Sequence, residues 1–389
     1  MSRASTKLDR VPDITVVSDV GTLSRRRGRA TVIYDPQVLA LNPWLREAVE
    51  RWFECELLVA IQGGEPTAES IEGTAAEARA AGSDVIVSVG GGSTIDTAKG
   101  VALLALGATR LPREFAPNWE VGEPKPHVAI PTTAGPGAEA SPAIVYGLVG
   151  ANTTVCAHRA LIPREVVICG AVGSTLPRWL NATCILDGVA HSVECLLSAD
   201  CPGLAQELCG DALLTFGNAL ERIDHAPDDV DERERLAIAS IMSASGLRLA
   251  GVHAVHALAR GLAEGVQAPH SLLVSLCLTA MMRLLPSSSW ALMDSRLAMR
   301  SAVHHSQLRS CVEKVHDTVI APEIARHILV RNGCGVEACA TVAKNDPRWA
   351  RSSIQLNGAM LERLFRYLLS EVLHLPSGSR LIGKRDRGR

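Results

Sequence analysis

Residues Ser83–Lys99 have the sequence SDVIVSVGGGSTIDTAK, which predicts a strand, a tight glycine turn and the start of a helix. The apolar run Ser83–Val89 is bounded by turn-forming residues, a pattern typical of a buried parallel strand. Ser93 is a plausible N-cap of the helix, with Asp96 as its capping partner three positions later. Glycines let a backbone approach an anion closely, and the free N–H groups of a first helical turn point at it. The stretch therefore predicts a phosphate-binding turn, although it matches neither G-x-G-x-x-G nor a Walker loop. An ordinary turn is the alternative.

A second polar turn follows the predicted strand His127–Pro131. It has the sequence TTAGPGAE and begins with the hydroxyl side chains of Thr132 and Thr133. Hydroxyls and glycines at the carboxyl end of a strand suit a ligand crevice in an open α/β sheet. A plain connection between a strand and a helix is the alternative.

Four side chains further along the chain are candidate ligands of one divalent metal ion. Asp187 and His191 are four residues apart in LDGVAHSVECLL, so a helix places them on one face. His256 lies in a second predicted helix, and His270 follows in the turn-like segment APHS. One carboxylate and three imidazoles suit Fe(II) and Zn(II) about equally. Histidines with a purely structural role in the core or on the surface are the alternative.

The order of these motifs supports a family assignment. GGGSTIDTAK, IPTTAGPGAEAS, DGVAHSVE and a final H-x13-H pair with Pro269 before its second histidine follow one another along the chain. This order resembles the iron-containing (group III) alcohol dehydrogenases, which include maleylacetate reductases and phosphonoacetaldehyde-type reductases. The resemblance extends from about Val17 to about Leu369. It implies a cytoplasmic, NAD(P)H-linked, metal-dependent aldehyde reductase or alcohol dehydrogenase that acts on a small carbonyl or alcohol substrate and forms a homodimer.

The resemblance also implies a dehydroquinate synthase-like architecture, and the sequence pattern agrees with it. Strand-like runs (ATVIYD, ELLVAI, DVIVSVG, HVAIPTT, EVVICG) alternate with helical stretches up to residue 175, whereas helical periodicity dominates afterwards. A chain of 389 residues also exceeds the usual size of a single core. We therefore expect an α/β nucleotide-binding domain over residues 1–175 and an all-α metal-binding domain over residues 176–389, with the active site between them.

Further residues acquire expected roles by resemblance. The glycine turn would hold the cofactor pyrophosphate through Gly91, Gly92, Ser93 and Thr94, with Thr132 and Thr133 beside it. Asp35 ends ATVIYD at the family position that contacts the adenosine ribose. A carboxylate there accepts a hydrogen bond from the 2′-hydroxyl and repels a 2′-phosphate, which favours NAD(H) over NADP(H). A simple Asp35-Pro36 turn is the alternative.

The chain departs from the family pattern near the predicted substrate. Many members carry a histidine four residues after the third ligand, where this chain has Arg260. Arginine stays charged at neutral pH and cannot shuttle a proton, but it can bind a carboxylate or phosphonate in bidentate fashion. We therefore expect a small anionic aldehyde or ketone, with a salt bridge to Glu264 as the alternative role of Arg260. His253 lies three residues before His256 and is expected on the same helix face, where it is a candidate for the proton relay; the sequence favours a core or surface role over that one.

Composition argues against several other classes of protein. The 39 basic and 41 acidic residues are well mixed, which does not favour a nucleic-acid surface. The apolar stretch 271–285 contains Arg283 and is too short for a bilayer span, so it predicts a core helix and no membrane partner. Eleven cysteines without a CxxC pair indicate reduced thiols. A sugar-phosphate cyclase of the dehydroquinate synthase type, a maleylacetate-type reductase and a simple alcohol dehydrogenase remain alternative functions.

Overall fold

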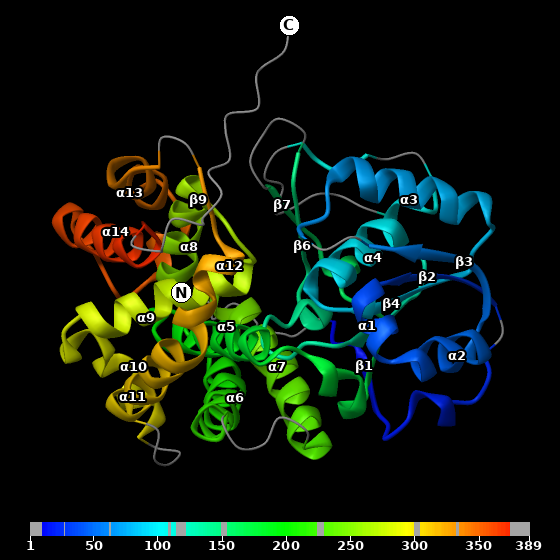
Figure 1. The fold of residues 1–389 in the computed structure, drawn as a ribbon, viewed down its shortest axis with the longest axis horizontal. Helices are drawn as coiled ribbons and strands as arrows, with labels where there is room; N and C mark the ends of the chain where they lie inside the picture. Colours follow the sequence, from blue (N-terminus) through cyan, green and yellow to red (C-terminus); the bar gives the residue numbers. More distant parts are fainter. Residues whose placement is uncertain are drawn as a thin grey trace, which may run out of the picture. The chain divides into compact units, whose positions relative to one another are not determined.

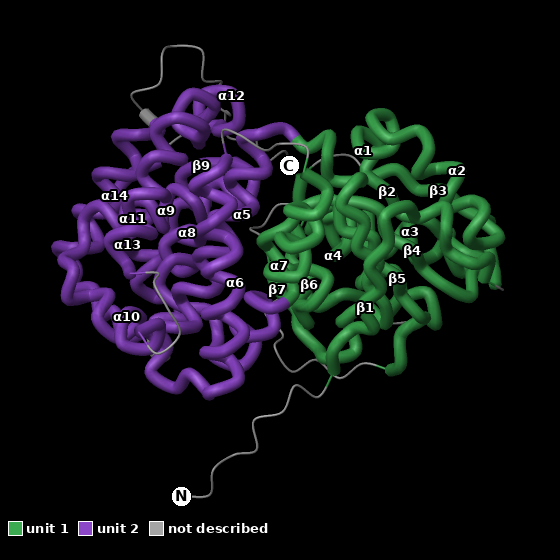
Figure 2. The backbone as a smooth tube through the Cα atoms, turned by 90° about the horizontal axis from the view of Figure 1, so that it is seen from below, with its two compact units in different colours: residues 1–176, 228–241 green, residues 177–227, 242–389 purple. Residues whose placement is uncertain are grey.

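The computed structural model describes residues 10–26, 28–61, 64–107, 110–113, 122–148, 154–223, 229–298, 304–331 and 334–373. The chain forms two compact units, coloured separately in Figure 2: residues 1–176 with 228–241, and residues 177–227 with 242–389. Unit 1 thus includes a segment from beyond residue 176, and the boundary after residue 241 falls inside helix α7 (Val230–Ala250). A functional domain boundary at residue 175 stays a prediction.

Unit 1 contains a six-stranded parallel sheet with the strand order β1-β8-β5-β4-β2-β3 (Figure 1). The strands are β1 (Asp13–Val16), β2 (Arg29–Tyr34), β3 (Glu54–Ala60), β4 (Val85–Gly90), β5 (His127–Pro131) and β8 (Glu165–Ile168). The five strand-like runs of the sequence correspond to β2, β3, β4, β5 and β8, which confirms the α/β class; the edge strand β1 was not predicted. A separate antiparallel pair is formed by β6 (Ala143–Tyr146) and β7 (Thr154–Ala157).

Helices cover both faces of this sheet because its inner strands are apolar on both sides. Neighbouring residues of a strand point to opposite faces, so Ile33 packs with α3 (Ala68–Ala80) and α4 (Gly92–Leu104). Val32 instead joins the core cluster that contains α2 (Pro43–Trp52). Figure 1 shows α3 and α4 on one side of the strands and α2 on the other.

Unit 2 is largely helical. Its central helix α5 is buried from Ala182 to Leu196 and packs against α6 and α9, while α8 packs against α9 and α13. The prediction of an all-α unit is correct except for two short strands, β9 and β10, which pair with each other. Its elements are α5 (Arg178–Leu196), α6 (Gly203–Glu221), α8 (Ala254–Gly265), β9 (Val266–Gln267), α9 (His270–Leu284), α10 (Ala291–Leu297), α11 (His305–Val315), α12 (Ile324–His327), β10 (Leu329–Val330), α13 (Val336–Lys344) and α14 (Gly358–Leu373).

The predicted core helix is α9, whose residues from Ser271 to Met282 are buried. Among the described residues, no single helix combines the length and apolar composition of a membrane span, although the bent pair of α7 and α8 passes that test when its two helices are taken together.

Candidate metal centre and cofactor-binding turn

The glycine turn leads from β4 into α4 in unit 1. The N-cap of α4 is Gly91, which has no side chain to cap the helix, so the first N–H groups of the helix can face an anion. The prediction that Ser93 is the N-cap is therefore wrong, because Ser93 lies inside the first helical turn. Asp96 is not its capping partner either. The Asp96 carboxylate instead accepts hydrogen bonds from Lys99 Nζ at 2.9 Å and from the Val145 N–H at 3.0 Å.

The two predicted cofactor segments lie side by side. A Cβ atom at Gly90 would meet Thr94 Oγ1 at 2.4 Å, and one at Gly91 would meet Thr133 Cγ2 at 3.3 Å. The N–H of Thr132 donates to the Gly90 carbonyl at 3.1 Å. Glycine is thus needed at Gly90 for the helix to begin this close to the strand. The turn and the threonine segment form one continuous edge at the carboxyl ends of β4 and β5.

Asp35 adds a third element to this edge. Its N–H donates to the Val89 carbonyl at 3.0 Å, so it lies at the end of β2 beside β4. The chain leaves β2 toward β3 but leaves β4 toward β5, in the opposite direction, which makes the gap between β2 and β4 a topological switch point. The carboxylate of Asp35 accepts a hydrogen bond from the Gln37 N–H at 2.9 Å and caps α1 (Pro36–Leu41). The structure thus gives Asp35 a local capping role, while a contact with a ribose stays a prediction.

The four predicted metal ligands cluster in unit 2. Asp187 and His191 are one turn apart on α5, and His191 Nε2 lies 3.5 Å from Asp187 Oδ1. His256, on α8, places Nε2 3.6 Å from the same oxygen. The His256 ring lies 5.0 Å from the His191 ring and 5.6 Å from the His270 ring, measured between centroids. His270 is the first residue of α9 with Pro269 as the N-cap, rather than part of a turn as predicted. Proline restrains the residue before the helix, so the chain turns directly into α9.

The chemistry of this cluster fits a metal ion. The Asp187 side chain is 1% exposed, and neither of its oxygens accepts a hydrogen bond from the part of the chain that the structure describes. A buried carboxylate without a hydrogen bond is costly unless a cation neutralises it. Donor atoms of Asp187, His256 and His270 all lie within 4.8 Å of one another. His191 falls outside that mutual limit but faces Asp187 directly.

The electrostatics of the cluster favour an ionised Asp187. Burial alone would raise the pKa of this carboxyl, but the three neighbouring histidines outweigh it and lower the pKa to about 2. Burial lowers the pKa of His191 to about 4, which keeps that ring neutral and able to donate its lone pair to a metal. Burial opposes the charged form of His256 as well, yet the carboxylate of Glu194 raises the pKa of this ring to about 9. Metal binding at His256 must therefore displace a proton.

Glu194 is a functional candidate that the sequence analysis missed. Its buried carboxylate accepts hydrogen bonds from His256 Nδ1 at 2.9 Å and from the N–H groups of His256 and His253 at 3.0 and 3.1 Å. A helical signal was available, because Glu194 lies three residues after His191 and seven after Asp187, on the same face of α5.

Of the two residues predicted near the substrate, Arg260 lies on helix α8 as expected and His253 does not. His253 is buried and immediately precedes α8 with non-helical angles (φ −135°, ψ −131°), so it does not share a helix face with His256 as predicted. Arg260 lies one turn after His256 on α8, with a side chain that is 53% exposed. Its Nε is 3.7 Å from Asp346 Oδ2, an ion-pair partner that the sequence analysis did not name, while a salt bridge to Glu264 stays a prediction.

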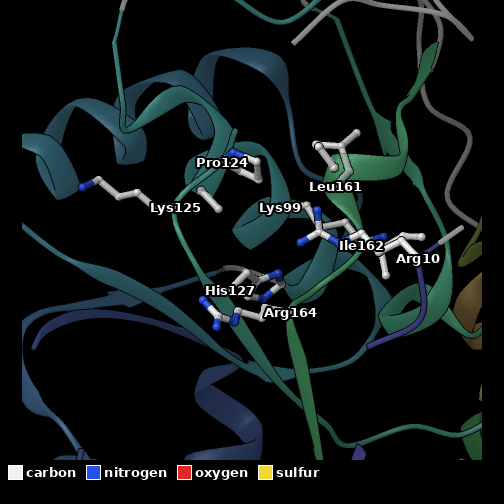
Figure 3. A pocket seen from close by; sticks show the side chains of 10 residues that line it. Arg10, Lys99, Pro124, Lys125, His127, Leu161, Ile162 and Arg164 are labelled. Carbon is white, nitrogen blue, oxygen red and sulfur yellow. The ribbon is translucent and has the colours of Figure 1, made fainter. Parts of the chain in front are cut away.

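A small basic cavity lies elsewhere in unit 1, at the amino ends of β5 and β8 (Figure 3). Its lining includes His127 together with Arg10, Lys99, Lys125 and Arg164. Because the strands are parallel, this cavity is at the sheet edge opposite the glycine turn, and it is not part of the predicted cofactor site.

Comparisons with known proteins identify the family. The sequence model of the iron-containing alcohol dehydrogenases matches residues 14–169, and that of the C-terminal part of the Fe-containing alcohol dehydrogenase family matches residues 181–344. The chain belongs to the iron-containing alcohol dehydrogenase family. The four clustered side chains and the glycine turn all lie within the matched residues.

Individual members of this family match at low identity. A probable alcohol dehydrogenase, EutG, of Escherichia coli (strain K12) is 27% identical over 220 residues, which is 56% of this chain and 56% of that protein. A phosphonoacetaldehyde reductase of Streptomyces viridochromogenes is 28% identical over 242 residues, 60% of this chain and 61% of that protein. The crystal structure of a sulfoacetaldehyde reductase from Bifidobacterium kashiwanohense in complex with NAD+ superposes with a TM-score of 0.78 at 14% identity, covering 95% of this chain and all of that one. These likenesses support the fold and the family.

Proposed function

We propose that this protein is a metal-dependent NAD(P)H-linked reductase that converts a small anionic aldehyde or ketone to the alcohol. The observation that carries the proposal is the buried Asp187 carboxylate, which has no hydrogen bond from described residues and is surrounded by three histidines. The nearest histidine nitrogens lie 3.5 and 3.6 Å from Asp187 Oδ1, too far for hydrogen bonds, so the carboxylate oxygens are left for a metal ion to bind. A phosphonoacetaldehyde-like substrate is our specific proposal.

The proposed mechanism assigns separate tasks to the two sites. Asp187, His191, His256 and His270 would hold one Fe(II) or Zn(II) ion, which supplies Lewis-acid polarisation of a carbonyl oxygen when bound. The available N–H groups at the start of α4 would bind the cofactor pyrophosphate, with Gly91 permitting close approach. The nicotinamide supplies the hydride, so the chain contributes position and electrostatics. We favour NAD(H), because the Asp35 carboxylate ends β2 beside the glycine turn, where it would repel a 2′-phosphate.

Arg260 is the proposed anchor for the anionic group of the substrate. It follows His256 by one helical turn, so both side chains lie on the same face of α8. Its partner Asp346 also accepts two hydrogen bonds from the guanidinium of Arg348, at 2.7 and 2.6 Å. One carboxylate thus serves two arginines, and the exposed guanidinium of Arg260 would bind a carboxylate or phosphonate. The phosphonoacetaldehyde reductase among the relatives acts on an aldehyde of this kind, as its name states.

Simple alcohols and neutral aldehydes are the second candidate substrate class, favoured by the likeness to a probable alcohol dehydrogenase. A maleylacetate-type reductase would also take an anionic substrate. A sugar-phosphate cyclase would recycle its NAD instead of consuming NADH stoichiometrically.

The test is NADH oxidation by protein reconstituted with Fe(II) or Zn(II), with phosphonoacetaldehyde and a neutral aldehyde of similar size. We expect metal-dependent turnover that favours the anionic aldehyde, and loss of turnover in His256→Ala. Arg260→Ala should raise KM for the anionic aldehyde far more than for the neutral one. Arg348→Ala is the matched control, because it removes the other arginine from Asp346. Equal effects of Arg260→Ala on the KM of both aldehydes would contradict the anionic substrate but not the reductase activity. If the metal-bound protein turns over neither aldehyde, other carbonyl substrates are tested next, and then the cyclase activity.

A further inference from the structure

We infer that Glu194 is the positioning residue of the metal centre, which fixes the ring of His256 and the start of α8 before any metal binds. The inference rests on the proposed metal site, and it concerns a residue outside the predicted ligand set. Glu194 is 2% exposed, so water does not compete for its two carboxylate oxygens.

The first part of the argument concerns the imidazole of His256. Its Nδ1 lies 2.9 Å from Glu194 Oε2, and a carboxylate at that distance requires a proton on Nδ1. In the neutral ring this leaves Nε2 unprotonated, and Nε2 is the atom that lies 3.6 Å from Asp187 Oδ1. Glu194 therefore selects the tautomer whose lone pair faces the remaining ligands, an arrangement that generally strengthens metal binding by histidine.

The second part concerns the backbone. The first N–H groups of a helix have no partner within the helix, and the side chain of His253 does not cap α8. Glu194 supplies the missing acceptors from a different helix, α5. Its Oε2 accepts the N–H of His253, and its Oε1 accepts the N–H of His256. A negative charge at the amino end of α8 is also favourable for the helix dipole.

These two roles combine in one side chain. The carboxylate connects α5, which carries Asp187 and His191, to the first turn of α8, which carries His256. Because both oxygens are used, Glu194→Gln cannot preserve the arrangement. A carboxamide has one acceptor oxygen and one NH2 group, so its NH2 must face at least one N–H donor of α8. The variant keeps the size of the side chain but loses at least one of the hydrogen bonds that fix the His256 ring and the start of α8.

The experiment measures metal affinity without reference to turnover. The Kd for Zn(II) is determined by competition with a chelator for the wild type, Glu194→Gln, His256→Ala and Ser192→Ala. Ser192 is a matched control on the same helix: its side chain is fully buried, and its hydroxyl donates to the Gly188 carbonyl of its own helix. We expect Glu194→Gln to weaken binding by about 10- to 100-fold, while Ser192→Ala leaves the Kd near that of the wild type.

The outcomes separate this inference from the proposed function. A wild-type protein that binds neither Zn(II) nor Fe(II) contradicts the metal site itself. Tight wild-type binding that is lost in His256→Ala but unchanged in Glu194→Gln overturns only the role of Glu194. NMR of metal-free wild-type protein with nitrogen-labelled histidine gives a second readout that needs no variant to fold. We expect the Nδ1-protonated neutral tautomer at His256 at high pH, and a dominant Nε2-protonated tautomer there would overturn the inference.

Discussion

His127 should make the protein lose stability as the pH falls. The ring is 4% exposed at the amino end of β5, and its Nε2 lies 2.8 Å from the Ser88 hydroxyl. Burial and the nearby Lys99 ammonium lower its pKa from the ordinary 6.5 to about 3. Below pH 6.5 the unfolded chain therefore binds a proton at this position while the folded chain does not, and each pH unit costs about 1.4 kcal/mol of folding free energy. The expected loss is about 2 kcal/mol at pH 5, and it continues to grow until about pH 3.

Urea unfolding of the wild type and of His127→Gln, at about pH 7.5 and about pH 5, measures this contribution. Glutamine retains a polar group for Ser88 but does not titrate. Other groups contribute to the pH dependence of both proteins and cancel in the difference between them. We expect the free energy of unfolding to fall by about 2 kcal/mol more in the wild type than in His127→Gln over this interval. An equal fall in both proteins would refute the reasoning, because it would show that His127 is protonated in the folded state.

Three further predictions concern packing, the cofactor edge and the metal. A Cβ at Gly261 would lie 2.5 Å from the Cys339 carbonyl oxygen, so Gly261→Ala should lower the free energy of unfolding in urea by about 1–3 kcal/mol. Gly217→Ala is the control, because this helical site has open space around it, and it should raise that free energy by up to about 1 kcal/mol. Asp35→Ser should retain a capping side chain for α1 and so keep the melting temperature, but raise kcat/KM for NADPH relative to NADH; an unchanged ratio would assign Asp35 to capping alone. Removal of bound metal with a chelator should lower the melting temperature, because the ion binds only the folded cluster, and readdition should restore it.

The elements of the fold could be predicted where the local pattern was unambiguous. Parallel strands buried on both faces leave long apolar runs, and β2, β4, β5 and β8 were found from those runs. The edge strand β3 is only partly buried but keeps the apolar run LLVA, which was enough to find it. The edge strand β1 was missed because its four residues, DITV, are mostly exposed and leave no apolar run. Asp187 and His191 could be paired from their helical spacing, but nothing local indicates that His256 and His270 meet them. Their residue type made them candidates, and the order of motifs in a known family supported grouping all four at one metal ion.

The residues that were placed wrongly share a physical cause. Asp96 has the sequence position of a capping residue for its own helix, yet its carboxylate serves the buried Lys99 ammonium and the Val145 N–H of β6. An ammonium that is fully removed from water must be paired, and that requirement outweighs a local cap worth about 1 kcal/mol.

A buried carboxylate also sets the local structure at the metal cluster. His253 was expected on a helix face because the helical pattern of the sequence extends through it, but α8 begins only after it, where Glu194 accepts the N–H groups of His253 and His256. In both units a buried carboxylate therefore accepts the backbone N–H of a distant element, although Asp96 also binds the side chain of Lys99 in its own helix. Such an acceptor fixes where the distant element lies, which no periodicity within that element can reveal. It follows that Asp96→Asn should disturb the β6–β7 pair through the Val145 N–H rather than the start of α4; hydrogen exchange that increases at the start of α4 but not at Val145 would contradict this account.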